Sequence, residues 1–176
     1  MKYGLLITAA SLAVACFAAP VAAAQQSGPP PEWCDAPASR QFDFWIGEWT
    51  VTNPQGVKVG DSSITREEKG CLIVEHWTSA RGNKGQSYNF YDPETKAWRQ
   101  VWVAASEMTD YSGALNAKGE MVLEGVSRLA GGKTQKSRGT WTANKDGTVR
   151  QRFEDWDPKS KTWQESFNGL YTPKAG

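Results

Sequence analysis

This chain has a single histidine and almost no net charge, and each of these two features excludes a class of function. His76 is the only histidine among the 176 residues, so sites built from several histidines are excluded. No Gly-x-Ser-x-Gly motif positions a serine nucleophile, so no catalytic residue is predicted. The net charge is +1 without a basic run, which gives no electrostatic reason to bind nucleic acid. We expect neither a metal site nor a cofactor.

The first 24 residues, 1–24, are typical of a signal peptide. Lys2 gives a positive start, an apolar run covers residues 4–19, and three small alanines end at Ala24. We predict cleavage near Ala24 and a periplasmic or secreted protein. Cys16 leaves a lipoprotein open, although the apolar character continues past it. No second apolar segment follows, so stable insertion into a membrane is not expected.

Two cysteines, Cys34 and Cys71, remain after this cleavage. An even pair in an oxidising compartment most often forms a disulfide. The alternative of a metal or redox pair lacks Cys-x-x-Cys spacing. Residues 25–38 contain three consecutive prolines at 29–31 and few apolar residues, which predicts an extended arm. The disulfide would tie this arm to the strand that begins at Cys71.

Alternation of side chains with a period of two predicts strands through most of the remaining sequence, and no sustained helical period appears. Dipeptides such as Asn53-Pro54 and Asp146-Gly147 mark turns between the strands. About ten short antiparallel strands favour an all-β, up-and-down barrel, with a sandwich as the alternative. We predict one barrel domain over residues 39–173. The expected strands are 48–53, 58–68, 71–79, 85–91, 97–104, 109–115, 119–127, 134–143, 147–156 and 162–171.

An aromatic segment before the first strand predicts how the barrel is closed. Phe42, Phe44 and Trp45 lie on a short helical turn, and apolar rings there can close one end of a barrel. Gly47 allows a sharp bend into the strand. The ring of Trp49 is then expected to be buried against the floor of the barrel. The alternative is an ordinary buried helix followed by a strand.

Two segments, 91–98 and 156–163, share an aromatic residue, Asp-Pro and a closing Trp. Asp and Pro favour a type I turn, so the flanking aromatics should face each other across a hairpin. This register places Asn89 opposite Gln100.

Polar and aromatic side chains then share one face of neighbouring strands, a mixture that suits a ligand pocket. The alternative is that the amides face water and the tryptophans only fill the core. The predicted ligand-binding residues are Glu75, Trp77, Asn89, Gln100 and Trp102.

Several linked motifs resemble an uncharacterised group of bacterial exported lipocalin-like proteins. They include Phe-Asp-Phe-Trp-Ile-Gly-Glu-Trp at 42–49, Glu-His-Trp at 75–77, Asn-Phe-Tyr-Asp-Pro at 89–93 and Phe-Asn-Gly-Leu-Tyr at 167–171. The resemblance implies a calycin-type barrel, with Gly47 and Trp49 standing in a Gly-x-Trp signature, and no established activity. Nitrobindin-like haem barrels are similar in shape. Their histidine ligand near the C-terminal end has no counterpart here, because no histidine follows His76.

Two functions remain open. The first is an exported binding protein that holds a small apolar or amphipathic molecule inside the barrel. The second is an enzyme, an isomerase or a hydrolase, that acts on such a molecule with Glu75 as general base. A structural envelope protein with a filled barrel is a third alternative. The identity of the ligand and the oligomeric state are not predicted.

Overall fold

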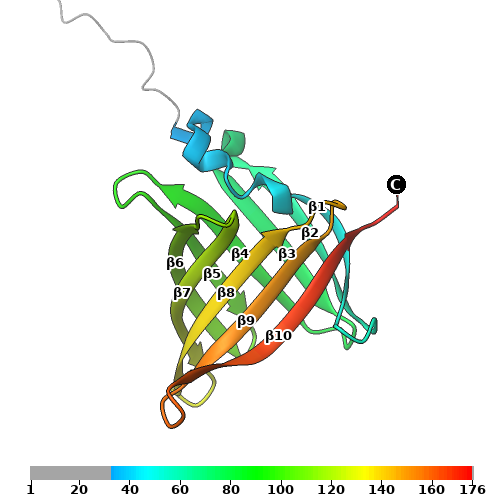
Figure 1. The fold of residues 1–176 in the computed structure, drawn as a ribbon, viewed down its shortest axis with the longest axis vertical. Helices are drawn as coiled ribbons and strands as arrows, with labels where there is room; N and C mark the ends of the chain where they lie inside the picture. Colours follow the sequence, from blue (N-terminus) through cyan, green and yellow to red (C-terminus); the bar gives the residue numbers. More distant parts are fainter. Residues whose placement is uncertain (1–32, 176) are drawn as a thin grey trace, which may run out of the picture. The chain divides into compact units, whose positions relative to one another are not determined.

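Successive antiparallel pairing along the chain produces a closed barrel (Figure 1). The computed structural model describes residues 33–175, which contain ten strands; the predicted signal peptide and residues 25–32 lie outside this range. Each strand pairs with the next, and β1 pairs with β10 to close the ring. The strands are β1 (Gly47–Thr52), β2 (Lys58–Glu67), β3 (Leu72–Ser79), β4 (Lys84–Asp92), β5 (Ala97–Ala104), β6 (Glu107–Leu115), β7 (Glu120–Leu129), β8 (Thr134–Ala143), β9 (Val149–Asp157) and β10 (Thr162–Pro173).

The all-β barrel predicted from the sequence is confirmed, and the ten expected strands agree with the observed bounds to within two residues. The two Asp-Pro hairpins have the predicted register. Tyr91 faces Trp98 with ring centroids 6.1 Å apart, and Trp156 faces Trp163 at 5.4 Å. In the first hairpin, Asp92 accepts hydrogen bonds from the backbone of the turn, which fixes its conformation.

Three short 3-10 turns precede β1, namely η1 (Trp33–Asp35), η2 (Pro37–Arg40) and η3 (Asp43–Trp45). The described part of the predicted extended arm is therefore wound into turns. Cys34 is buried there and forms the predicted disulfide with Cys71, with the two Cα atoms 4.7 Å apart. The bond joins η1 to the residue between η4 (Glu68–Gly70) and β3. This covalent anchor explains why the arm is held in turns beside the barrel.

The aromatic segment closes one end of the barrel as predicted. Trp45 is completely buried, and its ring stacks on Phe42 with centroids 5.1 Å apart. Trp49 is 4% exposed and donates its indole N–H to the carbonyl oxygen of Trp45 at 3.0 Å. Gly47 has φ +150°, and a Cβ atom there would lie 3.3 Å from the Trp49 ring. Glycine therefore suits both the bend and the close approach of the indole.

Aromatic and aliphatic side chains fill the half of the barrel next to this closed end. Phe42 packs edge-on against Trp98 and Trp141, with centroids 5.5 and 5.3 Å away. Met121 and Leu123 complete the layer without exposed surface. Rings of this size bury large apolar areas and dominate the stability of a core. The main hydrophobic core therefore occupies the half of the barrel next to the 3-10 turns.

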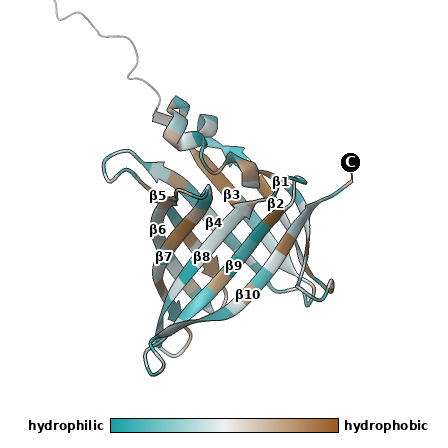
Figure 2. Cartoon of the chain, in the orientation of Figure 1, coloured by the Kyte–Doolittle hydropathy of each residue, from teal (hydrophilic) through white to brown (hydrophobic). Residues whose placement is uncertain are grey.

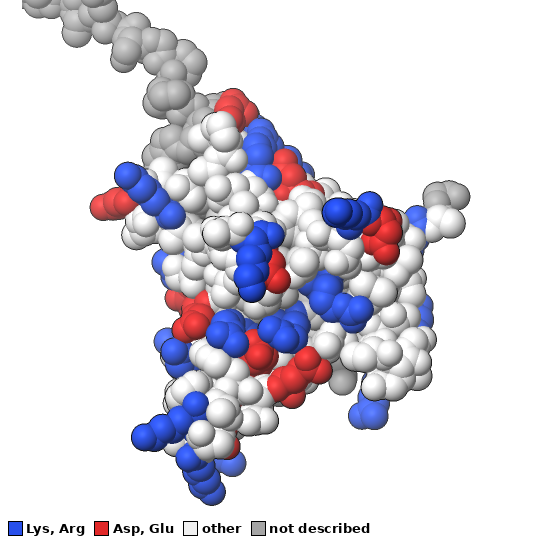
Figure 3. Space-filling model, viewed as in Figure 1, with Lys and Arg blue, Asp and Glu red and all other residues white. Residues whose placement is uncertain are grey.

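The outer surface carries mixed charge. Hydrophobic segments are interspersed among hydrophilic ones along β10 (Figure 2), and basic and acidic groups lie close together on the face shown in Figure 3. Arg138 contacts Glu154 at 2.7 Å, and Arg99 contacts Asp110 at 2.7 Å. Within residues 33–175, no helix has the length and apolar character needed to cross a membrane.

Candidate functional site

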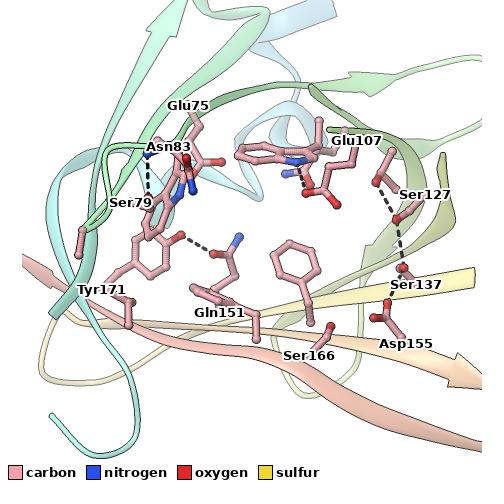
Figure 4. A pocket seen from close by; sticks show the side chains of 18 of the residues that line it. Glu75, Ser79, Asn83, Glu107, Ser127, Ser137, Gln151, Asp155, Ser166 and Tyr171 are labelled. Atoms are coloured by element: carbon pink, nitrogen blue, oxygen red, sulfur yellow. Dashed lines mark hydrogen bonds between the residues drawn. The ribbon is translucent and has the colours of Figure 1, made fainter. Parts of the chain in front are cut away.

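The half of the barrel away from the 3-10 turns encloses a cavity of about 760 Å³ (Figure 4). Its walls come from β2, β3 and β5 to β10, and the β1–β2 and β3–β4 loops contribute to its mouth. The volume lies within the range of roughly 300–1,000 Å³ that is typical of small-molecule sites. The aromatic side chains of the wall are Trp77, Trp102, Tyr111, Phe153, Phe167 and Tyr171.

Four of the five residues predicted to bind a ligand lie on this wall. Glu75 and Trp77 come from β3, and Gln100 and Trp102 come from β5. Asn89 does not reach the cavity. It is completely buried, and its amide donates to the Ile73 carbonyl while accepting from Gln100 at 2.6 Å. Asn89 therefore holds the Gln100 side chain by a hydrogen bond from the neighbouring strand β4 and does not itself line the cavity.

Glu75 is an acidic side chain buried in the wall, with only 3% of its surface exposed. Its two carboxyl oxygens accept hydrogen bonds from Ser62 and Ser87, each at 2.9 Å. Burial raises the pKa of Glu75 from 4.5 to about 7, and interactions with Ser62, Ser87 and Tyr171 oppose this rise. The carboxyl group is therefore close to half protonated at neutral pH.

Tyr171 and Gln151 complete this side of the cavity. The Tyr171 hydroxyl donates to the side-chain oxygen of Gln151. Burial, followed by the charge of Glu75, raises the pKa of Tyr171 well above its usual value, so its hydroxyl stays protonated. The Gln151 amide nitrogen points into the open space (Figure 4). Gln151 is 3% exposed, and its NH₂ group has no hydrogen-bond partner among residues 33–175.

A second polar wall, opposite Glu75 in Figure 4, was not predicted from the sequence. Thr109 donates to Ser127 at 2.8 Å, Ser127 lies 3.1 Å from Ser137, and Ser137 donates to Asp155 at 2.7 Å. These four residues come from β6, β7, β8 and β9 in turn. Extending the hairpin register could have found part of this wall, because Ser137 pairs directly with Asp155 across β8 and β9.

Glu107 lies beside this wall and fixes one of the tryptophans. One of its carboxylate oxygens accepts the indole N–H of Trp102 at 2.8 Å. Burial raises the pKa of Tyr111 to about 12, and the charges of Glu107 and Asp155 act in the same direction. Both carboxylates therefore exert their fields on the Tyr111 hydroxyl from inside the barrel.

Two glycines give the tryptophans their positions. A Cβ atom on Gly60 would lie 2.4 Å from the Trp77 ring, and one on Gly85 would lie 2.3 Å from the Trp102 ring. Each indole is therefore seated directly over the backbone of a neighbouring strand. This packing keeps the rings against the wall and leaves space in the middle of the barrel.

The described residues offer no ready site for a metal or for a histidine-bound haem. Within residues 33–175, no cluster of three or more His, Cys, Asp or Glu side chains is arranged to hold a metal ion. His76 is exposed on the outer face of β3, between the inward-facing Glu75 and Trp77, so it does not reach the cavity. The chain matches no protein-family model, and no curated protein matches it.

Proposed function

We propose that this chain is an exported binding protein of lipocalin-like type that holds a small amphipathic molecule inside its barrel. The observation that carries the proposal is the cavity of about 760 Å³, whose wall combines six aromatic side chains with polar groups from most of the surrounding strands. Sites for small molecules have this composition, since apolar surface supplies affinity and a few polar groups set orientation. The signal peptide predicted for residues 1–24 and the motifs that resemble those of exported lipocalin-like proteins agree with this role.

The hollow in the barrel argues against a purely structural role. A barrel that serves only as a scaffold gains stability by filling its interior, as the half around Trp45 and Trp141 does. The other half instead seats Trp77 and Trp102 against its wall over Gly60 and Gly85. Gln151 also presents an unpaired NH₂ group to the space, which costs free energy unless a ligand or water accepts the hydrogen bond.

The surroundings of Glu75 favour binding over catalysis. The pKa of about 7 would suit a general base. However, both carboxyl oxygens of Glu75 already accept hydrogen bonds from Ser62 and Ser87, and the side chain is 3% exposed. The carboxyl group thus serves to hold neighbouring strands together at the cavity wall.

Native mass spectrometry of protein purified from its own host tests the proposal. The wild-type protein should retain a small molecule that is released on unfolding. Ser166 lines the cavity and has no hydrogen-bond partner among residues 33–175, so Ser166→Trp should fill the space and abolish retention. Ser112 is exposed on the outer face of β6, and Ser112→Trp is the matched control that should keep the molecule.

Two results would contradict the proposal. One is wild-type protein without any retained molecule that also fails to bind added apolar probes. The other is equal retention by wild type and the Ser166→Trp variant, because the molecule would then sit outside the cavity. Release of a chemically altered molecule during incubation would instead favour the isomerase or hydrolase.

A further inference from the structure

The charges inside the cavity are unbalanced. Glu107 and Asp155 each use one oxygen for a hydrogen bond, to Trp102 and Ser137 respectively. Neither carboxylate has an ion-pair partner among residues 33–175. A cation placed beside half-buried carboxylates interacts with them more strongly than it would in bulk water, because the effective dielectric is lower there.

The basic residues of the cavity lie only at its mouth. Lys58 begins β2 and contacts Asp61 at 2.7 Å, and Asp61 also pairs with Lys174. Arg81 is exposed in the β3–β4 loop. Apart from Lys58 and Arg81 at the mouth, the described lining residues carry no positive charge, whereas Glu107 and Asp155 are acidic and Glu75 is partly ionised near neutral pH. A cation bound in this part of the cavity would interact favourably with both carboxylates.

Aromatic rings stand next to these charges. Trp102 is bonded to Glu107 through its indole N–H, and Tyr111 is close enough to both carboxylates for their charges to act on its hydroxyl. The faces of Trp and Tyr rings attract cations, and the effect grows when the cation is desolvated. Carboxylates flanked by such rings are a suitable environment for an ammonium group attached to an apolar body.

The opposite side of the cavity provides a hydrogen-bond donor. Gln151 is 3% exposed, and its unpaired NH₂ group points into the space (Figure 4). Gln151 and Asp155 share the inner face of β9, four residues apart, which corresponds to about 13 Å along the strand. A ligand that uses both groups needs an acceptor atom at one end and a cation at the other.

We infer that the cavity selects an organic cation: an ammonium group held by Glu107 and Asp155 beside Trp102 and Tyr111, an apolar body against the aromatic wall, and a hydrogen-bond acceptor facing Gln151. The inference rests on the proposed function, because it names the chemical class of the molecule bound in the same cavity. It adds the sign of the ligand's charge and the orientation of the ligand in the cavity, neither of which follows from the cavity volume.

Isothermal titration with three probes of similar size and different charge tests the inference at pH 7.5. The probes are 2-phenylethylamine, 2-phenylethanol and 3-phenylpropanoate, which are a cation, a neutral molecule and an anion. We expect the amine to bind at least about tenfold more tightly than the alcohol, and the anion to bind most weakly. Glu107→Gln and Asp155→Asn should each remove most of this preference by weakening the binding of the amine.

Glu94→Gln is the matched control, because it removes a carboxylate from the exposed β4–β5 turn at the other end of the barrel. It should leave all three affinities unchanged. Far-ultraviolet circular dichroism and urea midpoints identify any variant that fails to fold, and the two cavity variants are independent of each other. Equal or tighter binding of the alcohol by the wild type would overturn the cation preference alone. A complete lack of binding by all three probes would overturn the binding function as well.

Discussion

Replacement of Glu75 by Gln should make the protein more stable at alkaline pH. Burial raises the pKa of Glu75 from 4.5 to about 7, so the folded state holds the proton more tightly than the unfolded chain. This contribution to stability is fully present below pH 4.5 and is lost as the pH rises to about 7. At about 1.4 kcal/mol per pKa unit, the loss is roughly 3 kcal/mol above pH 7.

Glutamine has nearly the shape of the protonated carboxyl group and cannot ionise. Its side-chain oxygen can still accept the hydrogen bond that Ser62 donates. At pH 4, wild type and Glu75→Gln should therefore agree to within about 1 kcal/mol of unfolding free energy. At pH 8, the variant should be more stable by about 2–3 kcal/mol, because only the wild type must bury a charge.

Urea unfolding followed by tryptophan fluorescence at pH 4, 6 and 8 measures this difference. Comparing the two proteins at each pH cancels the titration of all other groups that the substitution leaves unchanged. Glu94→Gln, in an exposed turn, should follow the wild type at every pH. A constant difference between pH 4 and pH 8 would refute the reasoning, since Glu75 would then ionise equally well in both states.

Three further substitutions test other parts of the structure. Trp49→Ala removes a 4% exposed ring from the closed end and should cost about 3–5 kcal/mol, so an unchanged urea midpoint would contradict the closure. The double variant Cys34→Ser, Cys71→Ser removes a cross-link with a sequence separation of 37, so its unfolding free energy should fall by about 3–4 kcal/mol in the same assay. An unchanged unfolding free energy would show that the disulfide does not form. Gly85→Ala places a methyl group in the volume of the Trp102 ring, so it should shift the fluorescence of that indole and weaken 2-phenylethanol binding; unaltered spectra and affinity would show that the ring does not rest there.

The strands and their register follow from local chemistry, which is why the sequence predicts them well. Turn residues mark each end, and the Asp-Pro hairpin at Asp92 sets Asn89 opposite Gln100 without any knowledge of the rest of the barrel. The period of two then places Glu75 and Trp77 on one face. These features can therefore be predicted from the pairing of neighbouring strands alone.

The second polar wall depends on information that no single hairpin contains. Thr109, Ser127, Ser137 and Asp155 each contribute one polar side chain from a different strand, and each looks like an ordinary strand residue by itself. Their meeting requires three successive strand pairings, β6–β7, β7–β8 and β8–β9, to be combined. Whether Asn89 faces the cavity or the filled half depends on how deeply the aromatic layer extends, and this is a property of side-chain packing rather than of alternation.

The unequal filling of the barrel has an evolutionary consequence. The rings around Trp45 and the disulfide at Cys34 stabilise one end, while the residues that line the cavity lie at the other. Substitutions near the mouth remove little of the packing that keeps the chain folded. Side chains at half-buried or exposed positions of the cavity, such as Glu107 and Ser166, can therefore be exchanged with little loss of core packing. For protein engineering, the same separation means that the cavity wall can be randomised while the aromatic core and the disulfide are left unchanged.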